Sequence, residues 1–298
     1  MNRVGIFLLA LFVVFPGVSK AQQQQPPELF TYPELIQLYE TPNLPEALQA
    51  KLDRLLTTPF ISNTASARVP ALPRSPELGT FVRVVQWNIE RGIEFDAIKA
   101  ALTGSARFSK LIDISYPRKS SDLKVILHQV ALLKQADVIV LNEVDWGMKR
   151  TEYRNVASDL AAALRMNYAY GVEFVEVDPI ALGTEEFEEL SAEDKATLKT
   201  QITVDKSRYR GLHGTAILSR YPLENVRLQP FEQQPHDWYK AERESVKPLE
   251  AGKRKASEVV FREKVQREIR RGGRMMLTAE IADERFPGGR MTIVATHL

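Results

Sequence analysis

The sequence predicts an α/β protein in which a buried sheet is flanked by helices. The run DVIVLN, residues 137–142, is almost continuously apolar, as expected of a strand that is covered on both faces. Helical periodicity precedes this run at residues 121–135 and follows it at residues 155–166. Further strand-like runs lie downstream. Helices and strands in this mixture indicate a sheet-based core with helices outside.

The N-terminus has the pattern of an export signal. A short basic start at residues 1–3 is followed by the apolar run VGIFLLALFVVF, and Ser19 and Ala21 are small residues at the positions that a signal peptidase reads. We expect residues 1–21 to be a signal peptide, cleaved after Ala21, and the protein to be exported to the periplasm or the extracellular space. The alternative is an uncleaved N-terminal anchor. The apolar run is shorter than the ~20 residues that span a bilayer, so no stable membrane span is expected after removal.

Residues 22–80 are predicted to be an N-terminal helical segment and linker. QQQQPP is a polar tether, and residues 61–79 are rich in Ser, Pro, Ala and Thr, which is typical of a connector. Between them, NLPEALQAKLDRLL, residues 43–56, predicts a helix with Asn43 as its cap and Pro45 in its first turn. Its apolar face consists of Leu48, Leu52, Leu55 and Leu56.

The main domain is predicted to span residues 81–298. The helix at residues 121–135 begins at Ser121 or Asp122, and a second helix covers residues 155–166. FPGG, residues 286–289, predicts a hairpin turn. Strands are expected at residues 81–89, 137–142, 167–177, 215–219, 274–282 and 290–298. One side of the first helix is apolar: Leu123, Ile126, Leu127, Val130 and Leu133.

Two charged insertions interrupt this domain, near residues 176–210 and 231–273. Residues 176–206 contain nine acidic and three basic side chains, whereas residues 239–274 contain twelve basic and six acidic ones. One interpretation is two separate solvated helical insertions. The other is that they dock on each other and form a wall beside the active site. Glu residues interrupt the basic stretch and aromatic residues are sparse, which disfavours a nucleic-acid role.

Composition excludes several classes of site. Cysteine is absent from the 298 residues, which excludes disulfides, cysteine-rich zinc sites, cysteine nucleophiles and lipid attachment through cysteine. The formal net charge of +2 gives no global field that would favour nucleic acid or an acidic membrane. We expect a monomer.

Polar side chains that follow apolar strands are the candidates for chemistry. Asn88 and Glu143 each come just after such a run, and their oxygen atoms suit Mg²⁺ or Mn²⁺. His297 ends a third run and can donate to a phosphate oxygen or take part in proton transfer. Structural alternatives exist: Asn88 could cap a turn, Glu143 could pair with Arg150, and a lone His is often structural. His213, in a glycine-flanked segment, can border the same site.

Four motifs in this order resemble the endonuclease/exonuclease/phosphatase superfamily. They are VVQWNIERG, DVIVLNEVD, HGTAILSRYPL and IVATHL, and the resemblance covers residues 81–298. The superfamily includes pancreatic deoxyribonuclease, abasic-site endonucleases, bacterial sphingomyelinases and inositol-polyphosphate phosphatases. The resemblance implies a four-layer α/β/β/α sandwich, with two mixed sheets face to face and helices outside.

The resemblance also implies roles for single residues. Glu143 matches the principal metal-binding Glu, Asn88 the Asn that orients the metal shell or a water, and His297 the His that contacts the scissile phosphate. Arg150 and His213 are assigned to substrate binding, although Arg150 could instead pair with Glu143 or Asp145. The implied activity is hydrolysis of a phosphoester with Mg²⁺ or Mn²⁺. The resemblance does not distinguish between nucleic acid, phospholipid head groups and inositol phosphates as the substrate.

The sequence departs from the family pattern after IVATHL. Family members continue with a Gly-Asp-x-Asn motif and a final Asp-His pair that activates water, whereas the sequence here ends at Leu298. The interpretation is an N-terminal fragment, with the sandwich incomplete at the C-terminus and no activity on its own. The alternatives are a naturally short pseudo-enzyme and a non-catalytic exported binding protein that reuses the fold.

Overall fold

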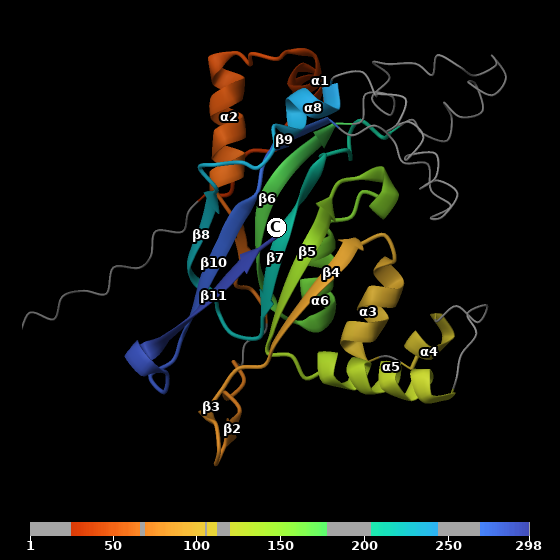
Figure 1. Ribbon diagram of the computed structural model, residues 1–298, viewed down its shortest axis with the longest axis vertical. Coiled ribbons are helices and arrows are strands. Elements are labelled where there is room, and N and C mark those ends of the chain that lie inside the picture. The colour runs from red at the N-terminus through yellow and green to blue at the C-terminus, as the bar shows by residue number, and fades with distance from the viewer. Residues whose placement is uncertain are drawn as a thin grey trace, which may run out of the picture.

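The computed structural model describes residues 25–65, 69–104, 106–111, 120–177, 204–243 and 269–297. Its larger sheet is mixed and has the strand order β1-β6-β7-β5-β4, with β9 also pairing with β6 (Figure 1). β4 and β5 are parallel, and the remaining pairs are antiparallel. The strands are β1 Phe60–Ser62, β4 Val84–Arg91, β5 Val138–Trp146, β6 Asn167–Val177, β7 Leu212–Ser219 and β9 Ile269–Gly272.

The second sheet is antiparallel, with the order β11-β10-β8. β8 spans Glu224–Pro230, β10 spans Met275–Ala282 and β11 spans Arg290–Thr296. β10 and β11 form a hairpin through the turn at Pro287–Gly289, which confirms the turn predicted from FPGG. The prediction of two mixed sheets therefore holds only for the first. In the described part of the chain, the second sheet is built from a hairpin and one further antiparallel strand.

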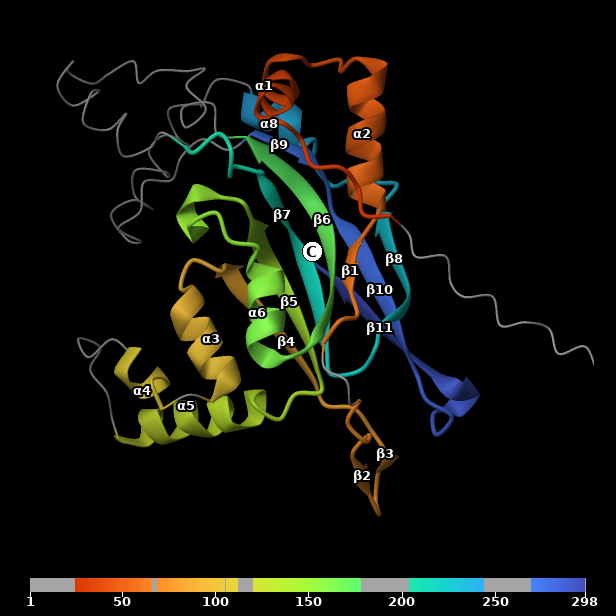
Figure 2. The ribbon, with the colours of Figure 1, turned by 180° about the vertical axis from the view of Figure 1, so that it is seen from behind.

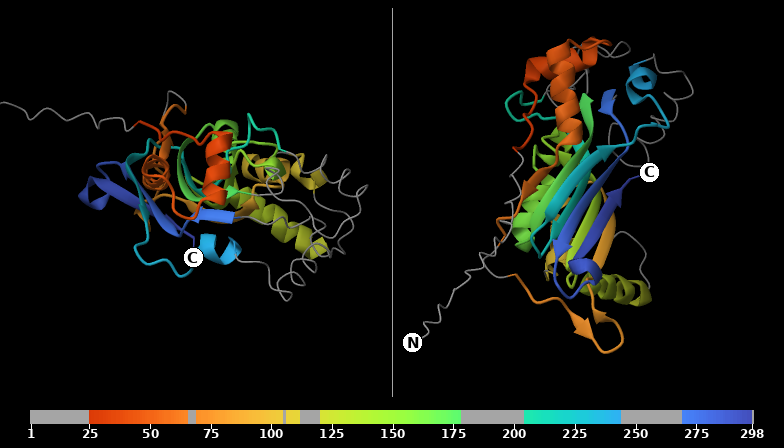
Figure 3. Two further views of the ribbon diagram at one scale, coloured as in Figure 1. Left: turned by 90° about the horizontal axis from the view of Figure 1, so that it is seen from above. Right: turned by 90° about the vertical axis from the view of Figure 1, so that its left-hand side faces the viewer.

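The two sheets pack face to face. Val140 and Ile217 from the first sheet share one buried cluster with Leu228, Leu277 and Ile293 from the second. Burial alternates along β10, so one side of this strand faces the other sheet and the opposite side faces outward. Figure 3 shows this outer face of the second sheet without a covering helix among the described residues.

Helices cover the other side of the first sheet (Figure 2). Ile139 and Leu141 point to this side, where they share a core cluster with Ile98 and Leu160. The described residues thus form three layers, α/β/β, and the fourth, helical layer stays a prediction. The helices of this layer are α3 Phe95–Thr103, α4 Phe108–Leu111, α5 Ser120–Leu133 and α6 Val156–Leu164.

The N-terminal helices pack against one end of the sheets. α1 spans Tyr32–Glu40 and α2 spans Glu46–Thr57. Pro45, with an extended ψ of 146°, is the N-cap of α2, so the prediction that Asn43 caps this helix was wrong. The predicted apolar face is confirmed, since Leu48, Leu52 and Leu55 are buried.

Residues 61–79 are not a plain connector. Ile61 belongs to β1, where it pairs with Ala169 of β6. Further along, β2 Arg74–Ser75 and β3 Gly79–Thr80 form a hairpin that projects from one end of the molecule (Figure 1). Arg271 of β9 also binds the last carbonyls of α1, with Nη2 at 2.6 Å from the Thr41 oxygen. The N-terminal segment is therefore fastened to the sheet by strand pairing and by a side chain.

Several predictions concern residues that the structure does not describe. The predicted signal peptide and most of both charged insertions, residues 178–203 and 244–268, lie outside the described residues. α8, Trp238–Arg243, is the described helix of the second insertion. Among the described helices, none is both long enough and apolar enough to cross a bilayer.

Candidate active site

An extra residue in β5 turns Glu143 out of the sheet. Between Leu141 and Val144, β5 contains one residue more than its partner β7, which is the definition of a β-bulge. Val144 consequently takes the fully buried, helix-facing position. Glu143 adopts a φ of 54° and its side chain is 26% exposed. The bulge explains how a carboxylate follows a buried strand without entering the core.

Bulges occur at the same level in the neighbouring strands. β4 has an extra residue between Asn88 and Arg91, and β6 has one at Glu173. Gly214 lies on β7 between these bulges, and a Cβ there would approach the Gly171 carbonyl oxygen to 2.0 Å. The row of bulges redirects polar side chains from three strands toward one place.

The structure brings Asn88, Glu143 and His297 together. Asn88 Nδ2 donates a hydrogen bond of 2.7 Å to Glu143 Oε1. His297 Nε2 lies 3.6 Å from the same oxygen. The three residues come from the end of β4, the bulge of β5 and the residue after β11. Segments more than 200 residues apart therefore meet at one carboxylate.

The orientation of Asn88 is fixed by its neighbour in the bulge. Its Oδ1 accepts from the backbone N–H of Glu90 at 3.0 Å, which leaves Nδ2 to donate to Glu143. Within the described residues, the contacts of the Glu143 carboxylate involve Oε1. Asn88 thus holds Glu143 in place, and Glu143 Oε2 remains available as a ligand.

Two further residues complete this site, and the sequence analysis did not assign them. Arg274 Nη1 lies 2.5 Å from Glu173 Oε1 and 3.0 Å from His297 Nδ1. Glu173 is 1% exposed, and its Oε2 lies 3.6 Å from His297 Nδ1 without a hydrogen-bond partner. Arginine can only donate, so His297 Nδ1 accepts and the ring proton is on Nε2, which faces Glu143.

A sequence signal for Glu173 did exist. It interrupts the apolar strand YGVEFVEV, residues 170–177, and a charged residue inside a buried strand needs a partner. The partner, Arg274, lies 101 residues further along the chain, and no local sequence pattern identifies it.

The site opens onto a groove between the edges of the two sheets. The cavity measures about 540 Å³ and is lined by β4, by β11 and by His297. Asn142 Nδ2 donates to the Thr296 carbonyl at 3.4 Å and so links β5 to the end of β11. The groove leaves room for a substrate beside His297.

Arg150 and His213 lie in a separate buried network. Arg150 Nε donates to Asp145 at 2.6 Å, and its Nη2 donates to Glu176 at 2.6 Å. His213 Nδ1 lies 3.0 Å from the Asp145 carboxylate. This geometry favours the pairing alternative for Arg150, with Asp145 rather than Glu143 as partner, over phosphate binding. His213 likewise faces the network instead of the groove.

The charged groups of this buried network stabilise one another. Burial alone would raise the pKa of Asp145, but Arg150 and His213 outweigh it and lower that pKa. Burial is likewise outweighed at Glu176, where Arg150, His213 and Arg91 hold the pKa at about 2. Burial would lower the pKa of His213, but Glu176 and Asp145 raise it. Both carboxylates are thus stabilised by the positive charges around them.

Within the described residues, two places offer atoms to a metal ion. Asp145, Glu176 and His213 present ligand atoms within 4.8 Å of one another, but they are buried and Arg150 already binds both carboxylates. A cation there would have to displace the guanidinium. Glu143 is more open and lies next to His297, which lines the groove. Carboxylate oxygens in such a place suit a hard ion that keeps several waters.

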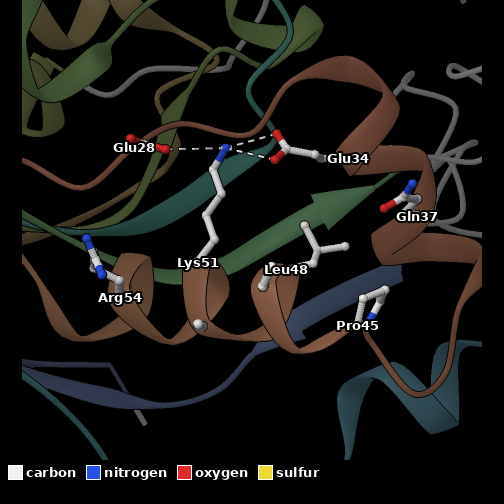
Figure 4. Close-up of a pocket in the computed structure, with 9 residues that line it drawn as sticks. Glu28, Glu34, Gln37, Pro45, Leu48, Lys51 and Arg54 are labelled. Atoms are coloured by element: carbon white, nitrogen blue, oxygen red, sulfur yellow. Dashed lines mark hydrogen bonds and ion pairs between the residues drawn. The ribbon is translucent and has the colours of Figure 1, made fainter.

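Another cavity, of about 470 Å³, lies between α1 and α2 (Figure 4). Lys51 points into it and donates to both oxygens of Glu34 at 2.9 Å, with Glu28 3.9 Å away. The lysine charge is therefore balanced by carboxylates, and the cavity has no link to Glu143. It is not favoured as the active site.

Comparison with known proteins identifies the family. The chain matches the endonuclease/exonuclease/phosphatase family over residues 85–292, a range that includes Asn88 and Glu143. It is also similar to a solved endonuclease/exonuclease/phosphatase from Beutenbergia cavernae DSM 12333, with 16% identity and a TM-score of 0.29; the match covers 73% of this chain and 38% of that chain. A search of curated proteins found no match. The chain belongs to the endonuclease/exonuclease/phosphatase family, whose members are typically metal-dependent phosphoester hydrolases.

Proposed function

We propose that the complete protein is an exported, metal-dependent phosphoester hydrolase: a phosphodiesterase, nuclease or phosphatase. The observation that carries this proposal is the meeting of Asn88, Glu143 and His297 within hydrogen-bond and ion-pair distances. Separate structural roles for these residues would not require them to meet. Family membership supports the reaction class.

Glu143 is the proposed ligand for Mg²⁺ or Mn²⁺. Its Oε2 is available, and Asn88 fixes the carboxylate through Oε1. When bound, such an ion neutralises phosphate charge and polarises the P–O bond. Asn88 acts on the ion through Glu143, because its Nδ2 holds that carboxylate. Its Oδ1 accepts one hydrogen bond from Glu90 and keeps a second lone pair for the ion.

His297 is the proposed phosphate contact. Its Nε2–H faces Glu143, and His297 itself lines the groove, so the ring can donate to a phosphate oxygen as negative charge develops. Arg274 donates to Nδ1 and so holds the ring in this tautomer and orientation, and Glu173 in turn holds Arg274. In the family that the chain resembles, an Asp-His pair activates the attacking water.

The test is hydrolysis of bis(p-nitrophenyl) phosphate by the complete protein with Mg²⁺, with Mn²⁺ and with EDTA. We expect activity to require the metal. Glu143→Gln should lower the rate about 100-fold or more, because it removes a charge that the transition state needs. The matched control is Glu152→Gln, a carboxylate that is 75% exposed and pairs with Arg154.

Glu143→Gln with an unchanged rate would remove this residue from the site. Tight binding of phosphoesters without turnover would favour the non-catalytic binding protein instead. A panel of oligonucleotides, phospholipids and inositol phosphates would then define the substrate class.

A further inference from the structure

The helices α4 and α5 expose an unusual amount of apolar surface. Nine large hydrophobic side chains are exposed in the described part of the chain, and four of them lie on these two helices. Leu132 is 52% exposed and Val125 is 55% exposed, and no described side chain of α5 is fully buried. The four are Leu111, Val125, Leu127 and Leu132.

The exposed aliphatic side chains of α5 lie beside an apolar groove of about 580 Å³. Ile126, Val130, Leu132 and Leu133 line this groove together with residues of α3 and β4. Val125, seven residues before Leu132, lies on the same side of the helix as Leu132. Exposed apolar side chains that lie together mark an interaction site. The exposed aliphatic side chains of α5 therefore indicate a contact with a partner.

The same part of the chain is basic. Residues 95–135 contain seven Lys or Arg and three Asp or Glu, a net charge of +4. The whole chain carries +2, so the remaining residues together carry −2. Four of these basic residues are exposed on or beside α4 and α5: Arg107, Lys110, Lys124 and Lys134. These four basic side chains lie on or beside the same two helices as the exposed aliphatic ones.

We propose that this α4–α5 surface, defined by these four aliphatic and four basic residues, docks on a lipid bilayer that contains anionic head groups. Aliphatic side chains ringed by Lys and Arg are the composition that binds such interfaces. A second copy of the chain would bring like charges together. Nucleic acid would need stacking aromatics, and Phe108 is the one aromatic residue within α4 and α5.

Docking in this way leaves the candidate active site open. α5 ends at Leu133 and β5 begins at Val138, whereas Glu143 lies toward the other end of β5 (Figure 1). At 3.3 Å per residue, the five residues from Val138 to Glu143 span roughly 17 Å. The surface would therefore concentrate the protein at a membrane, and this does not depend on the proposed hydrolase activity.

The experiment is co-sedimentation of the exported, processed protein with phosphatidylcholine vesicles, with and without phosphatidylglycerol. We expect binding to the anionic vesicles and its loss at high salt. Lys110→Glu with Lys124→Glu should weaken binding about fivefold or more for each lysine. Val125→Asn with Leu132→Asn should also weaken it. These four side chains are exposed, so the unfolding midpoint should not change.

Matched controls are Val294→Asn and Arg227→Glu, which alter exposed residues of the second sheet. Both should bind as the wild type does, and so should Glu143→Gln. The proposal would be overturned if the wild-type protein did not bind anionic vesicles. It would also be overturned if the surface variants bound them as tightly as the wild type does. A lipid-free dimer that the same variants disrupt would overturn it too, as would tighter binding to an oligonucleotide than to the vesicles.

Discussion

Glu143 has a left-handed backbone conformation, which residues other than glycine rarely adopt. Glu90 and Arg91, in the neighbouring bulge, have φ values of 50° and 66°. Unfavourable conformations of this kind gather at functional sites, where the surrounding structure enforces them. Here they serve to place one carboxylate beside Asn88 and His297.

The left-handed conformation of Glu143 predicts that two inactive variants of this residue will differ in stability. Glu143→Gly and Glu143→Ala both remove the carboxylate, but only glycine adopts a φ of 54° without strain. We expect the glycine variant to have a free energy of unfolding about 1 kcal/mol higher than the alanine variant. Urea denaturation measures the difference, and both variants should be inactive. An alanine variant at least as stable would show that the left-handed conformation is not retained.

The buried network predicts how stability depends on pH. The pKa of His213 is raised, so its stabilising contribution is complete below the ordinary value of 6.5 and is lost as the pH rises through the folded-state value. The pKa of Glu176 is about 2, so its contribution is present above 4.5 and is lost as the pH falls toward 2. The network should therefore stabilise most between these two ordinary values.

His213→Gln tests the upper side of this window. The stability advantage of the wild type over this variant should shrink as the pH rises above the ordinary value of 6.5 and through the raised folded-state pKa, because the imidazolium charge is lost. Free energies of unfolding from urea denaturation at each pH measure it. A constant advantage across that range would mean that His213 is neutral in the folded protein.

At the scale of elements, the aligned bulges in β4, β5 and β6 require close approach of the strands at Gly214. Glycine is required at position 214 for lack of space and not for its conformational freedom, since a Cβ there would lie 2.0 Å from the Gly171 carbonyl oxygen. Arg274 joins β9 to β10 and reaches the bulge of β6. The site therefore depends on strand register as much as on its own residues.

Gly214→Ala should accordingly disturb both fold and site. We expect a loss of about 3 kcal/mol in the free energy of unfolding, because backbone atoms must move. The control is Gly289→Ala, where φ is 73° but a Cβ meets no atom within 4 Å, so the cost should be only about 1 kcal/mol. Equal losses in the two variants would show that crowding at Gly214 is unimportant.

At the scale of the whole molecule, stability comes from two apolar clusters on the two sides of the first sheet. The cluster between the sheets holds the second sheet, and with it His297, against the strands that carry Asn88 and Glu143. Charge is also divided, with the basic α4–α5 surface near the start of β5 and the candidate site toward its end.

Leu277 tests the contribution of the cluster between the sheets. It is fully buried, so Leu277→Ala should reduce the free energy of unfolding by about 2–5 kcal/mol. Val294→Ala, on the exposed side of the same sheet, should change it by at most about 0.5 kcal/mol. Similar values for both would mean that the two sheets do not pack as described.

The sequence by itself determined the elements whose patterns are local. β6 covers the predicted residues 167–177, and α6 falls within the predicted helix at residues 155–166. Asn88, Glu143 and His297 could also be chosen, because each follows an apolar run and matches a family motif. Hydrophobic periodicity and strand ends are properties of neighbouring residues, which explains why these expectations were accessible.

The tertiary structure alone decided the rest. The bulges, the pairing of β1 with β6 and the partners of Arg150 and Glu173 depend on register between strands that are far apart in the chain. No local pattern specifies which charge meets which, or which strand gains a residue. The exposure of Leu127 is of the same kind, because periodicity places this residue on the apolar face of α5 but does not specify whether the molecule covers it.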